Sequence, residues 1–114
     1  MVKLIVSERR IDEMSILDLS GDIIFGEGNV VLRNAIRRLL GEGQKKIILN
    51  MENVGYVDSS GIGELVSGYT AINQEMGSFK LINLPKRVHD LLAICKLLTI
   101  FDVCDNTRNA PASY

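Results

Sequence analysis

Residues 46–69 read KIILNMENVGYVDSSGIGELVSGY, an apolar run, a turn sequence and the start of a second apolar pattern. Ile47, Ile48 and Leu49 are apolar without alternation, as in a central strand covered by helices. After the turn, apolar residues recur at intervals of three and four, which predicts an amphipathic helix. These residues are Ile62, Leu65, Val66, Tyr69, Ile72 and Met76. The segment therefore predicts a strand, a loop and a helix within an α/β fold.

The flanking segments predict further elements, each bounded by its own turn signal. The expected elements are strands at residues 2–6 and 16–19, a helix at 31–40, strands at 47–49 and 79–82 around the helix at 62–76, a helix at 85–95 and a possible short strand at 100–103. Ser20-Gly21-Asp22 is expected to close the second strand, which pairs antiparallel with the first. This order implies a mixed four- to five-stranded sheet with parallel later strands, right-handed crossovers and helices mainly on one face.

Length and charge limit the possible classes of protein. The 114 residues predict a single domain, with a core at about residues 3–105 and a loose tail at 106–114. The 13 basic and 14 acidic residues give a net charge of -1 without runs of one sign, which argues against nucleic acid or an anionic membrane as the partner.

No apolar run approaches the roughly 20 residues needed to span a bilayer, and no signal segment is evident, so a cytoplasmic location is expected. The sequence makes no prediction of an oligomeric state.

The residue types that bind metals and cofactors are few and dispersed. Cys95 and Cys104 are interpreted as small core residues in a reducing compartment, with a regulatory disulfide as the alternative. His89 is expected at the surface, and one histidine with two separated cysteines does not make a zinc site. Gly26-Glu27-Gly28 lacks the third glycine of a dinucleotide-binding fingerprint. We therefore predict neither a metal nor a cofactor.

The turn before the second helix carries the most informative chemistry. Because the apolar pattern starts only after the turn, Asp58 or Ser59 is expected to be the N-cap, which places Ser60 in the first helical turn. First-turn N–H groups lack intrahelical partners, and the helix dipole favours the roughly 1.5 to 2 negative charges of a phosphate there. Gly61 and Gly63 would let another protein's active site approach the serine closely. Considered alone, a tetrapeptide of this kind is far more often an ordinary capping sequence than a phosphorylation site.

The VDSSGIG segment at residues 57–63 resembles the signature of the STAS family. In that signature, an apolar residue, Asp, Ser or Thr, Ser, Gly, an aliphatic residue and Gly open a helix after a central strand. The resemblance extends to LSGD at 19–22, KIILN at 46–50, LINL at 81–84 and the stretch from 88 to 101, and covers about residues 3–105. It implies the STAS fold for this α/β chain.

The resemblance also implies a function. In family members that antagonise anti-sigma factors, the second serine of the motif is phosphorylated by a partner kinase that is itself the anti-sigma factor. Carried over by position, Ser60 is the acceptor. The implied protein is a non-enzymatic bacterial switch that binds the anti-sigma factor kinase until Ser60 is phosphorylated, and a phosphatase resets it. The expected acceptor-loop and partner-binding residues are Asp58, Ser59, Gly61, Ile62, Gly63, Asp22, Ile24, Phe25 and Glu27.

One position departs from the family pattern and leaves alternatives open. Ile24 stands where many antagonists carry an Asp, and Asp22 or Glu27 could supply a substitute carboxylate. The run Ile23-Ile24-Phe25 either packs over the end of the sheet or forms an exposed partner-binding loop. A second hypothesis is a non-catalytic scaffold subunit of a stress-signalling complex or of a transporter. A third, a hydrolase using one of the two serines, lacks a nearby general base and the Gly-x-Ser-x-Gly elbow.

Overall fold

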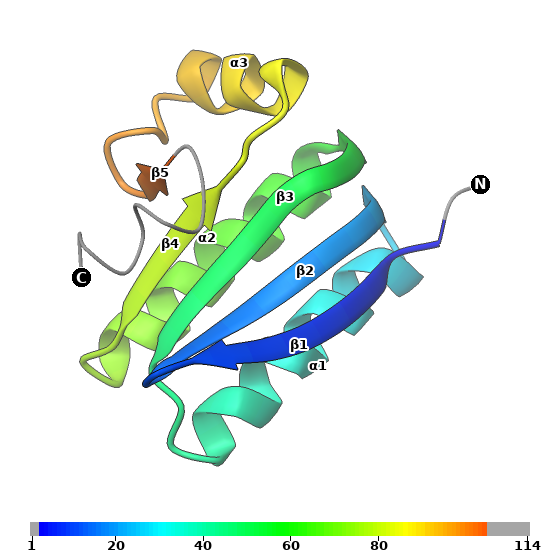
Figure 1. Ribbon diagram of the computed structural model, residues 1–114. Helices are drawn as coiled ribbons and strands as arrows, with labels where there is room; N and C mark the ends of the chain where they lie inside the picture. The colour runs from blue at the N-terminus through cyan, green and yellow to red at the C-terminus, as the bar shows by residue number, and fades with distance from the viewer. Residues whose placement is uncertain (1–2, 105–114) are drawn as a thin grey trace.

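The computed structural model describes residues 3–104 as an α/β unit (Figure 1). Its strands are β1 (Ile5–Ile11), β2 (Met14–Ile23), β3 (Lys46–Val57), β4 (Ser78–Ile82) and β5 (Asp102–Cys104), and its helices are α1 (Glu27–Gly41), α2 (Ser59–Gln74) and α3 (Lys86–Ile94). The strands lie in the sheet in chain order. β1 pairs antiparallel with β2, and the remaining neighbours are parallel. The predicted order of elements and the mixed sheet are confirmed.

The main hydrophobic core lies between the sheet and helices α1 and α2, which lie behind the sheet in Figure 1. The core residues from these elements include Leu17, Leu19, Leu32, Ile36, Leu39, Ile47, Leu49, Leu65 and Ile72. A smaller buried cluster occupies the opposite face and consists of Met14, Ile16, Ile48 and Ile82. Because successive strand residues point to opposite faces, the run Ile47-Ile48-Leu49 contributes to both clusters. The interpretation of this run as a buried central strand is confirmed, but α1 and α2 cover only the face of Ile47 and Leu49, and the cluster around Ile48 contains no helix residue among those described.

The first strand differs from its predicted position. It was expected at residues 2–6, but β1 runs from Ile5 through the charged residues to Ile11. As an edge strand whose side chains are mostly exposed, it needs no apolar alternation. The Arg9 guanidinium donates to both carboxylate oxygens of Asp18, at 2.6 and 3.1 Å. The charged stretch therefore pairs with β2 instead of forming a loop.

Two central strands are longer than predicted. β2 continues through Gly21 to Ile23, so residues 20–22 do not close it, and β3 continues to Val57. The extensions pair with each other in parallel, with Ile23 opposite Val57. This pairing satisfies backbone N–H and C=O groups that would otherwise lie in a loop. As a result, the turn at residues 58–61 that carries the predicted acceptor Ser60 (the acceptor turn) follows directly from the end of β3.

Helix α1 begins at Glu27, earlier than the predicted start at Val31. Its first turn lies against the end of β2, because a Cβ added to Gly28 would lie 2.7 Å from the Asp22 carbonyl oxygen. The segment from 27 to 29, which precedes the helix predicted at 31–40, is therefore helical. It places the side chain of Asn29 at the same end of the sheet as Ser60.

Helix α3 lies beyond the ends of β3 and β4, at the top of Figure 1. Val88 and Leu92 are buried as predicted, but Cys95 is exposed, so its assignment to the core is wrong. The helical pattern ends at Ile94, and Lys96 has a positive φ of 59°, which turns the chain away from the helix. The Cys104 side chain and the tail at 106–114 lie outside the described residues. Within residues 3–104, no helix has the length and apolar character needed to cross a bilayer.

Candidate functional site

The candidate site lies where β2 and β3 end and where α1 and α2 begin. Asp58 is the N-cap of α2, and its Oδ1 accepts a hydrogen bond from the Gly61 backbone N–H at 2.8 Å. The same oxygen accepts a hydrogen bond from the Ser60 hydroxyl at 2.6 Å. These contacts confirm the predicted capping turn, with Asp58 as its cap in preference to Ser59. They also place Ser60 in the first turn of the helix.

Asp58 connects the acceptor turn to the β2–α1 loop. Its Oδ2 accepts a hydrogen bond from the Phe25 backbone N–H at 3.1 Å, and its own N–H donates to the Ile23 carbonyl at 3.3 Å. The hydrogen bond from the Ser60 hydroxyl, followed by those from the Gly61 and Phe25 N–H groups, lowers the pKa of the Asp58 carboxyl. Asp58 is therefore ionised at neutral pH and accepts the Ser60 proton in a hydrogen bond.

Asn29 is a site residue that sequence reasoning missed. Its Nδ2 donates to Ser60 Oγ at 2.9 Å from the first turn of α1. The residue is only 7% exposed, and its Oδ1 is buried without a hydrogen-bond partner among residues 3–104. Ser60 Oγ thus accepts from Asn29 and donates to Asp58, which orients the hydroxyl. A contact between residues 31 positions apart leaves no periodic signal in the sequence.

The two glycines after Ser60 have different surroundings. Gly61 is buried, and a Cβ added there would lie far inside van der Waals contact of the Ile23 carbonyl oxygen and 2.8 Å from Val57 Cγ1. The space beside Gly61 is therefore filled by the protein itself, and the expectation that this glycine opens a path for a partner is wrong. Gly63 is exposed, with no atom within 4 Å of its added Cβ. Only the second glycine leaves open surface beside the site.

An ion pair one turn further along fixes α1 against α2. The Arg33 guanidinium donates to Glu64 through two hydrogen bonds, Nη2 to Oε1 at 2.7 Å and Nε to Oε2 at 3.2 Å. Glu64 is only 8% exposed. Arg33 lies four residues after Asn29 on α1, and Glu64 lies four residues after Ser60 on α2. The Arg33–Glu64 pair and the Asn29–Ser60 pair therefore lie on the same faces of the two helices. Together they tie the first two turns of both helices.

The predicted residues of the β2–α1 loop are dispersed around the site. Ile23 is fully buried, which agrees with packing over the end of the sheet. Phe25 is 82% exposed, so for this residue the packing alternative is wrong. Ile24 is half-buried between them. Asp22 Oδ1 lies over Gly55, and Glu27 pairs with Lys3 at 3.5 Å. Within residues 3–104, no hydrogen bond joins either carboxylate to Ser60.

The remaining predicted residues belong to the first turns of α2. Ser59 is exposed, and Ile62 is half-buried and packs against the main core. Ser59 is therefore an exposed residue, whereas the Ser60 hydroxyl is held by Asp58 and by Asn29 of α1. Among residues 3–104, no group of three or more His, Cys, Asp or Glu side chains could hold a metal ion.

The comparisons with known proteins agree on one family. The sequence model of the STAS domain family matches residues 6–110 of this chain. An anti-sigma F factor antagonist from Paenibacillus polymyxa is 30% identical over 95 residues, which cover 83% of this chain and 81% of that protein. An anti-sigma-B factor antagonist from Staphylococcus aureus is 31% identical over 67 residues, covering 59% of this chain and 62% of that protein.

Solved structures show the same fold. The crystal structure of an anti-sigma factor antagonist from Thermotoga maritima superimposes with a TM-score of 0.84 at 22% identity, covering 95% of this chain and 92% of that one. The Bacillus cell fate determinant SpoIIAA in its phosphorylated form gives a TM-score of 0.74 at 17% identity, covering 96% and 100%. At these identities, the two structures establish the fold alone.

Proposed function

This chain belongs to the STAS domain family, and from that premise we propose that it is an anti-sigma factor antagonist controlled by phosphorylation of Ser60. Anti-sigma factor antagonists are non-catalytic regulators. The observation that carries the proposal is the Ser60 hydroxyl, held by Asp58 and Asn29 at the start of α2. In this proposal the chain acts as one domain. Its partners are an anti-sigma factor with kinase activity and a phosphatase.

The hydrogen bonds around Ser60 orient its hydroxyl to receive a phosphoryl group. In the proposed reaction, Ser60 Oγ forms a bond to the γ-phosphorus of ATP held by the kinase, and the bond from that phosphorus to the bridging oxygen of ADP breaks. The hydroxyl proton must leave. Because the pKa of Asp58 is lowered, its carboxylate orients the O–H group but is a weak proton acceptor. In this proposal the proton passes to a base of the kinase.

Phosphorylation changes the contacts of the acceptor turn. The ester oxygen of phosphoserine can no longer donate to Asp58, whose Oδ1 lies 2.6 Å from Oγ in the unmodified protein. The phosphate adds about 1.5 to 2 negative charges beside that carboxylate, so the two groups repel. The Asn29 amide and the first turn of α2 partly offset this repulsion. In this proposal the phosphate on the half-buried Ser60 opposes renewed binding of the kinase.

Phosphorylation of variants by the anti-sigma factor kinase of the same organism tests the proposal. Intact-protein mass spectrometry should find one phosphate on the wild type and on Ser59→Ala, but none on Ser60→Ala. Ser59 is the matched control because it is the adjacent, exposed serine. In binding measurements, Ser60→Ala should retain affinity for the kinase and Ser60→Asp should lose it. Phosphate on Ser59, or equal binding by the two Ser60 variants, would overturn the proposal.

One observation favours the scaffold hypothesis as a second candidate. Ile24 replaces the acidic residue of many antagonists, and Phe25 beside it is largely exposed next to the site. An apolar loop at this position suits a permanent contact in a stress-signalling complex or with a transporter. Protein recovered from its native cells in a large assembly, with no phosphate on Ser60 under any growth condition, would support this alternative.

A further inference from the structure

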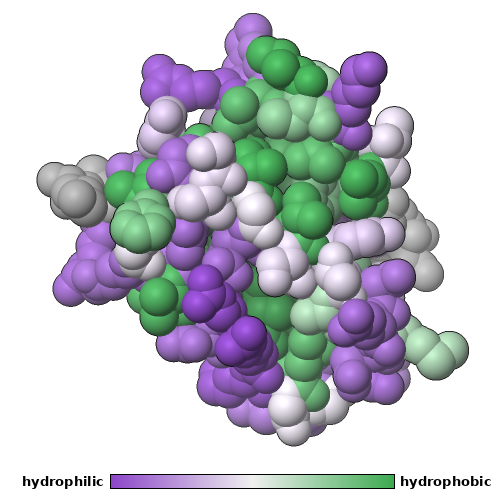
Figure 2. Space-filling model, turned by 180° about the vertical axis from the view of Figure 1, so that it is seen from behind, coloured by the Kyte–Doolittle hydropathy of each residue, from purple (hydrophilic) through white to green (hydrophobic). Residues whose placement is uncertain are grey.

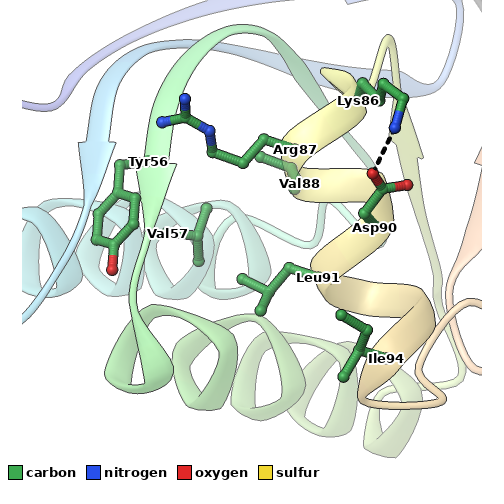
Figure 3. Close-up of a pocket in the computed structure, with 8 residues that line it drawn as sticks. All are labelled: Tyr56, Val57, Lys86, Arg87, Val88, Asp90, Leu91 and Ile94. Atoms are coloured by element: carbon green, nitrogen blue, oxygen red, sulfur yellow. Dashed lines mark hydrogen bonds and ion pairs between the residues drawn. The ribbon is translucent and has the colours of Figure 1, made fainter.

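A groove of about 580 Å³ lies between the end of β3 and helix α3 (Figure 3). It is lined by Tyr56, Val57, Lys86, Arg87, Val88, Asp90, Leu91 and Ile94. Figure 3 shows Arg87 and Leu91 extending from α3 toward the β3 residues, whereas Lys86 and Asp90 lie on the other side of the helix. Lys86 and Asp90 form an ion pair at 2.7 Å. The groove thus has an apolar interior, and the cation on its rim that is not paired with Asp90 is Arg87.

Two large side chains of the groove are exposed to water. Tyr56 is 50% exposed and Ile94 is 79% exposed. Figure 2, which views the molecule from behind, shows hydrophobic surface gathered at its upper end, where α3 lies in Figure 1. Contiguous apolar surface on a small protein is typical of an interaction site, because its burial against a partner is favourable.

The groove is continuous with the acceptor turn. Tyr56 and Val57 directly precede Asp58, and Val57 Cγ1 would be 2.8 Å from a Cβ on Gly61. Val57 therefore forms both a wall of the groove and a support for the turn that carries Ser60. A specific protein interface covers about 800 Å² on each partner, which is more than one helical turn provides. A kinase that covers Ser60 must extend over neighbouring surface, and the groove is adjacent.

The charge of the groove specifies what binds there. No residue between 3 and 104 forms an ion pair or a hydrogen bond with the Arg87 guanidinium, whereas Lys86 and Asp90 neutralise each other. Arg87 therefore leaves one positive charge beside the apolar interior. A carboxylate is its complementary partner, and arginine can bind both carboxylate oxygens at once.

We propose that this groove is a second contact surface for the anti-sigma factor kinase, an inference that rests on the proposed function. It binds a segment of the kinase in which an aliphatic or aromatic side chain enters between Tyr56 and Leu91. A neighbouring carboxylate of that segment pairs with Arg87. The contact gives affinity independently of the Ser60 hydroxyl and directs the kinase toward the acceptor turn.

Calorimetric titration with the purified kinase of the same organism tests the groove, with every variant carrying Ser60→Ala to exclude phosphorylation. Arg87→Glu and Ile94→Glu should each raise Kd about tenfold or more, as for truncated interface hot spots. The matched controls are Arg37→Glu, an exposed arginine on α1, and Met76→Glu, an apolar residue that is 92% exposed. Both controls should bind like the parent. Because all four side chains are exposed, circular dichroism should show unchanged folding.

The outcomes separate this inference from the proposed function. Equal Kd values for groove and control variants, together with loss of binding in Ser60→Asp, would reject the groove and leave the phosphorylation switch intact. A kinase that neither binds nor phosphorylates the wild type would reject both. Recovery of affinity for Arg87→Glu when one kinase carboxylate is changed to arginine would identify the residue that pairs with position 87 and support the groove directly.

Discussion

Replacing Gly61 by alanine tests whether packing against the end of β2 holds the acceptor turn in place. The added Cβ would overlap the Ile23 carbonyl oxygen and lie 2.8 Å from Val57 Cγ1. Neither group can move freely, because the carbonyl also accepts the Asp58 N–H at 3.3 Å and Val57 is buried. The same substitution at Gly63, two residues later in the same helix, meets no atom within 4 Å and is the matched control.

The expected magnitude follows from two opposing terms. Overpacking a buried site costs about 1 to 3 kcal/mol, and a clash with backbone places Gly61→Ala near about 3 kcal/mol. Alanine regains about 1 kcal/mol of helix propensity over glycine, which leaves a net loss of about 2 kcal/mol. With an unfolding entropy of about 2.1 cal/mol/K per residue, the Tm of this domain falls by about 8 °C. Gly63→Ala has only the propensity gain, so its Tm should rise by up to about 4 °C.

Thermal unfolding followed by circular dichroism measures both variants, and urea unfolding with an unchanged m-value excludes an altered denatured state. Phosphorylation by the kinase is the second measurement. If Gly61 served only the approach of a partner, the alanine variant would keep its Tm and lose phosphorylation. That result, or a Tm equal to that of Gly63→Ala, would refute the packing argument.

Other contacts around Ser60 give further predictions. Asn29→Ala should shift the Tm by less than about 4 °C, because the lost hydrogen bond of about 1 kcal/mol is offset by removal of a buried oxygen that has no partner in the described part of the chain. It should nevertheless slow phosphorylation of Ser60, and an unchanged rate would show that Asn29 does not orient the hydroxyl. Arg33→Met should lower the Tm more than Glu64→Gln, since it leaves a buried carboxylate unpaired, and the opposite order in thermal unfolding would contradict this. By NMR titration, the pKa of Asp58 should be higher in Ser60→Ala than in the wild type, because the hydroxyl is the main cause of its lowering. A lowered pKa contributes stability above the unfolded value of about 3.9 that is lost as pH falls through the folded value, so Ser60→Ala should lose less stability on acidification. Identical acid-unfolding curves would argue against this coupling.

Several elements could be predicted because their signals are local. The run Ile47-Ile48-Leu49 indicated a strand buried on both faces, and intervals of three and four indicated α2. The N-cap at Asp58 depends on a hydrogen bond to Gly61, three residues away. The ends of β1 could not be predicted, because an exposed edge strand carries charged residues without alternation. The elements that were predicted correctly carry a local sequence signal, whereas the exposed edge strand carries none.

The sequence by itself determined the order of elements, the capped acceptor turn and the resemblance to the STAS family that the comparisons confirmed. Only the tertiary structure decided which residues surround Ser60. Asn29 reaches the hydroxyl across 31 residues, Gly61 of α2 packs against Ile23 at the end of β2, and Arg87 borders a groove beside Val57. The physical reason is that periodicity and capping act within a few residues, whereas these contacts depend on how each helix packs against the sheet.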